Sequence, residues 1–182
     1  MKRTLVFTLL AMAGSGALAT TLAATAAQAA DVTAPVKEIM TEAQNGWSEN
    51  PVGEPRDYFD EERLKRIYSQ DFARVYKDAT RFPAFEDGDS PLDYDPIVSG
   101  QDSCSLKDVK IVPAAPEGAR ADVAVTFDNI SCLEDPGERK PAELHFIVVE
   151  ENGKPVVDDI LRGGEQGSLK AELVAIAAQS AQ

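Results

Sequence analysis

The sequence is poor in histidine, cysteine, aromatic residues and positive charge. It has one histidine and two cysteines, and aromatic residues make up 7% of its 182 residues. A zinc site needs three or four His, Cys or carboxylate ligands, so this composition argues against zinc. Lys and Arg together number 18 against 31 Asp and Glu, which gives a net charge of −13. Such a chain repels phosphate backbones and anionic lipid headgroups, so nucleic acid and membrane surfaces are poor candidate partners.

The first 29 residues have the pattern of a secretory signal peptide. Lys2 and Arg3 precede an apolar run, and small residues at Ala27 and Ala29 suit cleavage just after Ala29. An uncleaved membrane anchor is the alternative, but the second half of the stretch is rich in Gly, Ala, Ser and Thr. We therefore predict a periplasmic protein, or alternatively a secreted one, with a single domain over residues 30–182. Removal of 29 residues leaves 153 and takes away two cations, so the net charge becomes −15.

Two helices are expected in the first half of the mature chain. Thr33 can cap the first, which should end at Asn45 and Gly46. Apolar residues at helical spacing over residues 64–79 predict a second, longer helix that begins after Asp57 or Asp60. The aromatic stripe of this helix includes Tyr68, which either packs in the core or lines a ligand cavity.

The second half alternates as strands do. We predict four consecutive antiparallel strands and a closing helix, at residues 106–112, 121–130, 143–150, 155–161 and 168–178. Asn152 and Gly153 form a strong hairpin signal between the last two strands. The fold class is α+β, with N-terminal helices packed on a curved four-stranded antiparallel sheet.

Residues 83–101 form a long connection that is rich in Asp, Pro and Gly, and long ordered connections are often binding regions. Its acidic residues 86–95 could attract calcium, but an EF-hand loop that begins at Asp87 would need Gly where Leu92 stands. We predict no metal and no cofactor.

The two cysteines, Cys104 and Cys132, are expected to form a disulfide, since an exported chain folds in an oxidising compartment. A hairpin that turns near residues 114–118 brings them close together at its open end. The rival interpretation, a redox-active pair, lacks the C-x-x-C spacing.

The single histidine, His145, lies within a predicted strand and shares a face with Glu143, Ile147 and Val149. If that face is concave, His145 could pair with an Asp as an acid/base dyad. A lone strand histidine is more often a packed or surface residue. Asp158 and Asp159 are adjacent on a strand, so they should point to opposite faces.

Two short motifs carry a resemblance to a known family. They are Asp95-Pro96-Ile97-Val98-Ser99-Gly100-Gln101-Asp102 and Val156-Val157-Asp158-Asp159-Ile160, and together with the order of the elements they resemble the exported bacterial domain of unknown function 3828. That family is similar in fold to nuclear transport factor 2, a cone-shaped α+β roll with a pocket between helices and sheet. The resemblance implies Tyr94, Asp95, Gln101 and Asp102 as pocket-mouth candidates, although each could equally stabilise a turn.

These observations support three functional hypotheses. The first is a non-enzymatic periplasmic binding or interaction protein with a small-ligand pocket, because no convincing catalytic set is found. The alternative is an acidic immunity or inhibitor protein that blocks a basic protein partner, for which the charge of −15 suits fast, salt-sensitive association. The third is an acid/base enzyme that uses His145.

Overall fold

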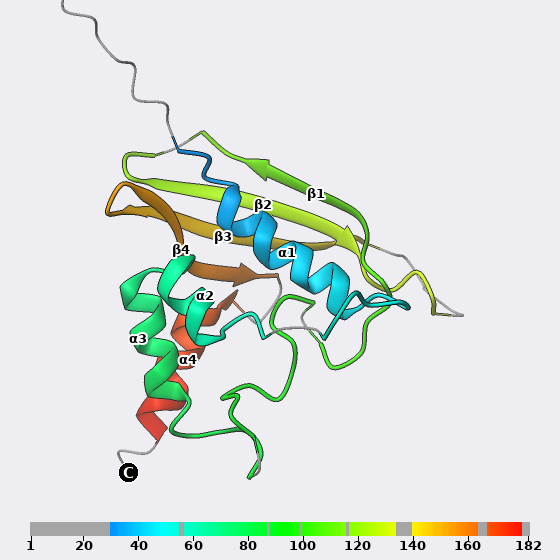
Figure 1. Cartoon of the computed structure of the whole chain (residues 1–182), viewed down its shortest axis with the longest axis horizontal. Helices are drawn as coiled ribbons and strands as arrows, with labels where there is room; N and C mark the ends of the chain where they lie inside the picture. The colour runs from blue at the N-terminus through cyan, green and yellow to red at the C-terminus, as the bar shows by residue number, and fades with distance from the viewer. Residues whose placement is uncertain are drawn as a thin grey trace, which may run out of the picture.

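The computed structural model describes residues 30–54, 57–86, 88–98, 100–115, 117–133, 140–163 and 167–179. The predicted signal peptide lies outside the described residues and stays a prediction. Within these residues, four helices and five strands follow one another in an α+β order (Figure 1): α1 (Ala34–Gly46), α2 (Glu61–Arg66), α3 (Gln70–Ala79), β1 (Lys107–Pro113), β2 (Arg120–Asp128), β3 (Ala142–Glu151), β4 (Lys154–Arg162), β5 (Gly167–Ser168) and α4 (Leu169–Ala178).

The strands form one open antiparallel sheet in the order β1-β2-β3-β4-β5. The four long strands lie where alternation predicts them, and β5 is a two-residue addition paired with β4. Asn152 and Gly153 have φ angles of 54° and 74°, the positive values that a tight two-residue hairpin requires. The sheet is not a closed barrel, and the resemblance to the nuclear transport factor 2 roll remains a prediction.

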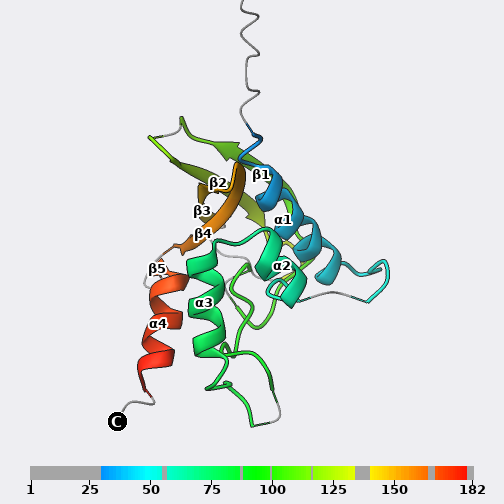
Figure 2. The same cartoon turned by 60° about the vertical axis from the view of Figure 1, so that its left-hand side comes forward.

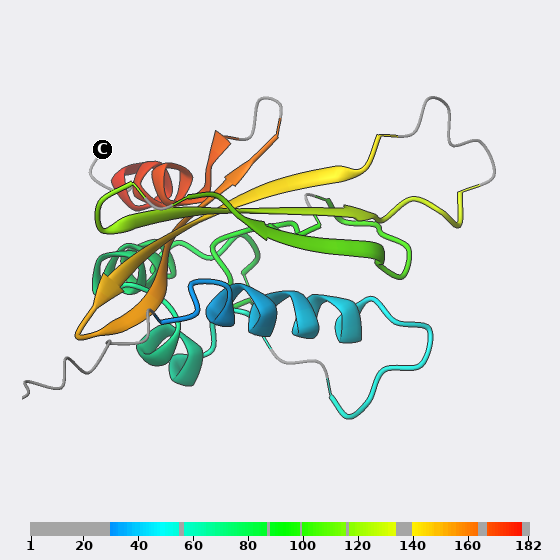
Figure 3. The ribbon, with the colours of Figure 1, turned by 90° about the horizontal axis from the view of Figure 1, so that it is seen from above.

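Helix α1 lies across one face of the sheet and contacts β4 (Figures 2 and 3). Its apolar stripe is completely buried, with Val36, Ile39 and Met40 at most 1% exposed. The inward residues of β2 alternate with half-buried ones, and Val123 of β2 and Phe146 of β3 are fully buried. Burial of side chains of this size stabilises the fold by about 1.5 to 3 kcal/mol each. Side chains thus fill the inner face of the sheet, where the resemblance implies a ligand pocket.

The prediction of one long helix over residues 64–79 is wrong. Between α2 and α3 the backbone is extended at Ser69, whose side chain accepts a hydrogen bond from the Phe72 N–H and so begins a new helix. The Ser69 N–H donates to the Val157 carbonyl, and the Val157 N–H donates to the Ile67 carbonyl, at 2.8 Å each. Pairing with β4 therefore interrupts the helix.

Two arginines hold α2 against α1. Arg66 forms a bidentate ion pair with Glu38, with both N–O distances 2.6 Å. The buried guanidinium of Arg63 donates to Glu42 at 2.7 Å and to Asp60 at 2.8 Å. Much of the negative charge of this region is therefore neutralised inside the fold.

A bulge in β4 overturns the expectation that Asp158 and Asp159 point apart. Ile147 pairs with Asp159 but Val148 pairs with Val157, so Asp158 is the extra residue. Asp158 accepts from the hydroxyl of Ser69, the N-cap of α3, at 2.7 Å. Asp159 accepts from the hydroxyl of Ser168, the N-cap of α4, at 2.6 Å. The two adjacent carboxylates anchor the N-termini of two helices.

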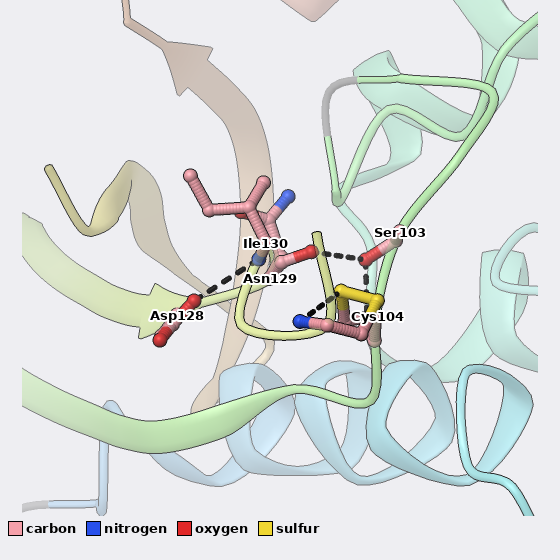
Figure 4. The surroundings of a disulfide bond; sticks show 6 residues. Ser103, Cys104, Asp128, Asn129 and Ile130 are labelled. Carbon is pink, nitrogen blue, oxygen red and sulfur yellow. Dashed lines mark hydrogen bonds between the residues drawn. A yellow bond between two sulfur atoms is a disulfide. The ribbon is translucent and has the colours of Figure 1, made fainter. Parts of the chain in front are cut away.

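The predicted disulfide is present between Cys104 and Cys132, with the Cα atoms 5.7 Å apart (Figure 4). It fastens the segment before β1 to the segment after β2. The Cys104 N–H donates to the Asn129 carbonyl at 2.7 Å, and the Ser103 hydroxyl donates to the Cys104 carbonyl at 2.9 Å. The bridge and these hydrogen bonds close the open end of the β1–β2 hairpin.

We predict that Cys104→Ser/Cys132→Ser lowers the free energy of unfolding by about 3 to 4 kcal/mol. The bridge joins residues 28 positions apart, and its loss restores that loop entropy to the unfolded chain. Urea unfolding should show this loss, with the melting temperature lower by about 10 °C. A reducing agent should affect the wild type to the same degree and the double variant not at all. Equal stability of oxidised and reduced wild type would contradict the prediction.

Candidate functional site

A surface hollow of about 430 Å³ gathers three of the residues that the sequence motif singles out. It lies between the end of α1 and the connection from α3 to β1, and Tyr94, Asp95 and Gln101 line it. Its other lining residues are Trp47, Phe85, Leu92, Asp93 and Gly100. The connection of residues 83–101 is thus folded against the end of α1 and forms a candidate binding surface.

Asp95 is the structural centre of this region. One carboxylate oxygen accepts from the Trp47 indole N–H and from the Tyr58 hydroxyl, both at 2.8 Å. The other oxygen accepts from the backbone N–H groups of Ile97 at 2.8 Å and Val98 at 3.2 Å. Burial, together with the nearby Asp95 charge, raises the pKa of Tyr58 above its usual range. With four hydrogen bonds accepted, Asp95 organises the turn and has little capacity left for a ligand.

Tyr94 connects the hollow to α4 and β4. Its hydroxyl donates to Glu172 of α4 at 2.6 Å, and Arg162 of β4 donates both to Tyr94 and, at 2.7 Å, to Glu172. The guanidinium of Arg162 also lies over the Tyr94 ring, 5.6 Å from its centroid. Tyr94 is therefore held in place by a network that includes a completely buried arginine side chain.

The remaining motif residues have separate positions. Gln101 donates to the Asp93 carbonyl at 3.0 Å and so closes the turn. Asp102 is exposed and does not line the hollow. Tyr68 is buried in the core, where its ring stacks on Phe72 with centroids 4.8 Å apart, and burial raises its pKa. The structure therefore brings together Tyr94, Asp95 and Gln101 but not Asp102, Tyr68 or His145.

The most exposed aromatic side chain of this region is Phe85, with 62% of its surface accessible. Glu86, Asp89 and Asp93 are exposed in the same connection, and they form no ion pair with any residue that the structure describes. We call Phe85 with these three acids and the adjoining hollow the Phe85 surface. Aromatic side chains are enriched in protein-binding surfaces, and the rims of these surfaces are polar.

His145 lies on the face of the sheet turned away from α1. Its Nδ1 atom is 2.9 Å from Asp122, as the dyad hypothesis expects, and its Nε2 atom is 3.4 Å from Glu143. A hollow of about 390 Å³ lies beside the pair, lined in part by Asp122, Ile147 and Leu161. Since each ring nitrogen faces a carboxylate, the arrangement fits a cross-strand surface contact better than a base with a free nitrogen for a substrate.

Sequence reasoning missed Trp47, Phe85 and Leu92 as lining residues of the hollow. Phe85 is an isolated aromatic residue in a segment with no apolar period, and this pattern could have indicated that it lines the hollow. Over the residues that the structure describes, no group of three or more His, Cys, Asp or Glu is placed to hold a metal ion. No helix in the same part of the chain is long and apolar enough to span a membrane.

Comparison with known proteins adds one structural likeness. No family model and no curated protein matches the chain, so the resemblance to domain of unknown function 3828 stays a prediction. The chain is similar to one in the crystal structure of the type VI native effector-immunity complex Tae3-Tai3 from Ralstonia pickettii. The identity is 16%, the TM-score is 0.48, and the alignment covers 76% of this chain and 98% of that one. At this level, function has to be argued from the residues themselves.

We predict that Asp95→Asn lowers the free energy of unfolding by about 2 to 4 kcal/mol. Asparagine has one acceptor oxygen and one NH2 group, so one donor pair, either Trp47 with Tyr58 or Ile97 with Val98, loses its acceptor, and each partly buried donor without a partner costs about 1 to 3 kcal/mol. Asp93→Asn is the control, since that side chain is exposed and should change stability by less than about 0.5 kcal/mol. Urea unfolding measures both variants, and equal effects would contradict the structural role of Asp95.

The tyrosines predict how stability depends on alkaline pH. Burial is the main cause that raises the pKa of all four, to about 12 for Tyr94 and well above the usual value for the other three. An unfolded tyrosine has a pKa of about 10. The protonated tyrosines therefore stabilise the fold fully below pH of about 10, and this contribution is lost as pH rises toward about 12 and beyond. Tyrosinate absorbance should appear together with the loss of circular dichroism. Ionisation of half the tyrosines near pH of about 10 in a folded chain would contradict this.

Proposed function

We propose that the chain is a non-enzymatic protein-binding module of the immunity or inhibitor type, which binds a basic protein partner through the Phe85 surface. The observation that carries the proposal is an exposed Phe85 beside a hollow and three acids without an ion-pair partner among the described residues. Aromatic anchors supply much of the binding energy in protein interfaces, and free charge around them accelerates association with an oppositely charged partner.

The rigid attachment of the surface supports this role. The Asp95 hydrogen bonds and the Tyr94–Arg162–Glu172 network fix the segment that follows Phe85. A preorganised surface loses less conformational entropy on binding than a mobile loop does. The net charge of −13 adds a long-range attraction for a basic partner.

The small-ligand hypothesis finds less support in the packing. The resemblance implies a ligand between sheet and helices, where α1 and the inward strand residues are buried against each other. The enzymatic hypothesis rests on His145, whose ring nitrogens both face carboxylates. Export to the periplasm or beyond is part of the proposal, and the disulfide supports it because such bonds persist in oxidising compartments. A nuclear transport factor 2-like fold also remains a proposal.

We predict that Phe85→Ala weakens partner binding at least tenfold, because an anchor that contributes about 1.4 kcal/mol or more is lost. The immobilised protein would be incubated with periplasmic extract of its source cells, and the retained proteins quantified by mass spectrometry. Val112→Ala is the matched control, since Val112 is 59% exposed on the sheet, away from the hollow.

Charge provides the second arm of this experiment. Glu86→Gln/Asp93→Asn should reduce capture more at about 50 mM salt than at about 500 mM, where exposed charges are screened. Glu117→Gln/Glu150→Gln removes the same charge from the β1–β2 turn and from the end of β3, and should leave capture nearly unchanged. If capture does not depend on Phe85 and is insensitive to salt, the proposed function is wrong.

A further inference from the structure

A second surface groove lies on other elements than the Phe85 surface. It has a volume of about 720 Å³ and runs between α2, α3 and the β3–β4 hairpin. Its apolar lining residues are Leu64, Tyr68, Ala73 and Val156. Figure 1 shows the hairpin next to the N-terminal end of α3, so hairpin and helix form two sides of one groove.

The polar lining of this groove has the opposite sign to the chain as a whole. Two acidic side chains, Asp78 and Glu151, line it, against six basic ones: Lys65, Arg66, Arg74, Lys77, Arg81 and Lys154. In a chain with a net charge of −13, such a gathering of cations needs a reason. The simplest explanation is a solvated helix face with internal ion pairs, but it explains only some of the six cations.

Four of the six cations have carboxylate partners within the fold. Lys65 pairs with Glu61 at 2.6 Å, and Arg66 pairs with Glu38 and Glu62. Arg74 pairs with Asp71 and Asp78, and Arg81 pairs with Asp78 as well. These pairs make the rim of the groove nearly neutral.

Lys77 and Lys154 are different, because neither side-chain ammonium forms an ion pair or hydrogen bond with any residue that the structure describes. Both side chains are exposed, and they come from separate elements, Lys77 from α3 and Lys154 from the start of β4. An anionic group in the groove can therefore reach a free ammonium from either side. The pKa of Glu61 is lowered, mainly by its hydrogen bond with Lys65 and further by the charge of Lys77, so cations of this groove already attract a carboxylate.

We infer that this groove binds a short, extended acidic peptide segment whose carboxylates pair with Lys77 and Lys154 and whose apolar side chains contact Leu64, Ala73 and Val156. From Gln70 to Lys77, α3 rises by about 10 Å, which matches about three residues of extended chain. In an extended peptide, alternate side chains point the same way about 6.6 Å apart, so carboxylates and apolar groups fall on opposite sides.

Because the rest of the chain is acidic, a peptide segment with few charges fits this groove better than a polyanion does. A nucleic acid or an anionic membrane would extend past the groove and meet the negative surface within a Debye length of about 8 Å. A segment of a few residues stays within reach of the two lysines. Ligand and groove would thus be complementary locally even though the chain as a whole is acidic.

The test uses a fluorescent pentapeptide of alternating glutamate and leucine with blocked ends, titrated into the intact mature protein. Lys77→Met/Lys154→Met, which removes both charges and keeps the side-chain length, should weaken binding at least fivefold. Lys107→Met/Lys110→Met on β1 removes the same charge elsewhere and should leave binding unchanged. Amide chemical shifts of Ala73 and Val156 should move on titration in the wild type.

Three further arms make the outcome decisive. The same peptide with glutamine for glutamate should bind at least fivefold more weakly, and succinate should not displace the acidic peptide at equal concentration. Equal binding by the two lysine double variants, or displacement by succinate, would overturn the inference. Phe85→Ala should leave peptide binding unchanged, so failure here is distinguishable from failure of the proposed function.

Discussion

The placement of α3 and α4 depends on two adjacent carboxylates in the bulge of β4. Asp158 binds the N-cap of α3, and Asp159 binds the N-cap of α4. In a regular strand only one of two neighbouring side chains could face the helices, because successive side chains alternate. The bulge removes that restriction, and each cap contributes on the order of 1 kcal/mol besides fixing where the helix begins. Both surface sites follow from this placement, since α3 forms a wall of the groove and α4 carries the Glu172 that holds Tyr94.

The acidity of the chain has two distinct uses. Asp95, Asp158 and Asp159 accept hydrogen bonds from helix caps, turns and aromatic donors, and Glu38 and Glu42 neutralise arginines. These carboxylates stabilise the fold, and they are not available to attract a partner. The charge that remains free for binding is concentrated in exposed side chains such as those beside Phe85. Net charge alone therefore overstates the negative field that a partner meets, and its distribution decides which surface a basic protein would approach.

The sequence predicted what local pattern determines. Alternation placed the four long strands, and hairpin register brought Cys104 and Cys132 together. Helix α1 begins and ends where the sequence predicts, but the Thr33 side chain does not cap it, because its hydroxyl donates to Asp31. The break between α2 and α3 could not be predicted, because the apolar period continues through it and the interruption comes from pairing with Val157, far along the chain. The roles of Asp95 were hidden for the same reason, since Trp47 and Tyr58 lie 48 and 37 residues away in sequence. The motif left open whether Asp95 binds a ligand or stabilises a turn, and its four hydrogen bonds favour the turn.

The two proposed surfaces differ in charge and in construction, yet they share β4 as a support. Arg162 of β4 holds Tyr94 on one side, and Val156 and Lys154 of the same strand line the groove on the other. A change in the bulge would disturb both surfaces together through the helices that it anchors. A change in an exposed side chain such as Phe85 or Lys77 leaves those anchors intact and affects one surface only. Joint loss of both binding activities would therefore indicate a folding defect, whereas loss of one would assign it to the residues of that surface.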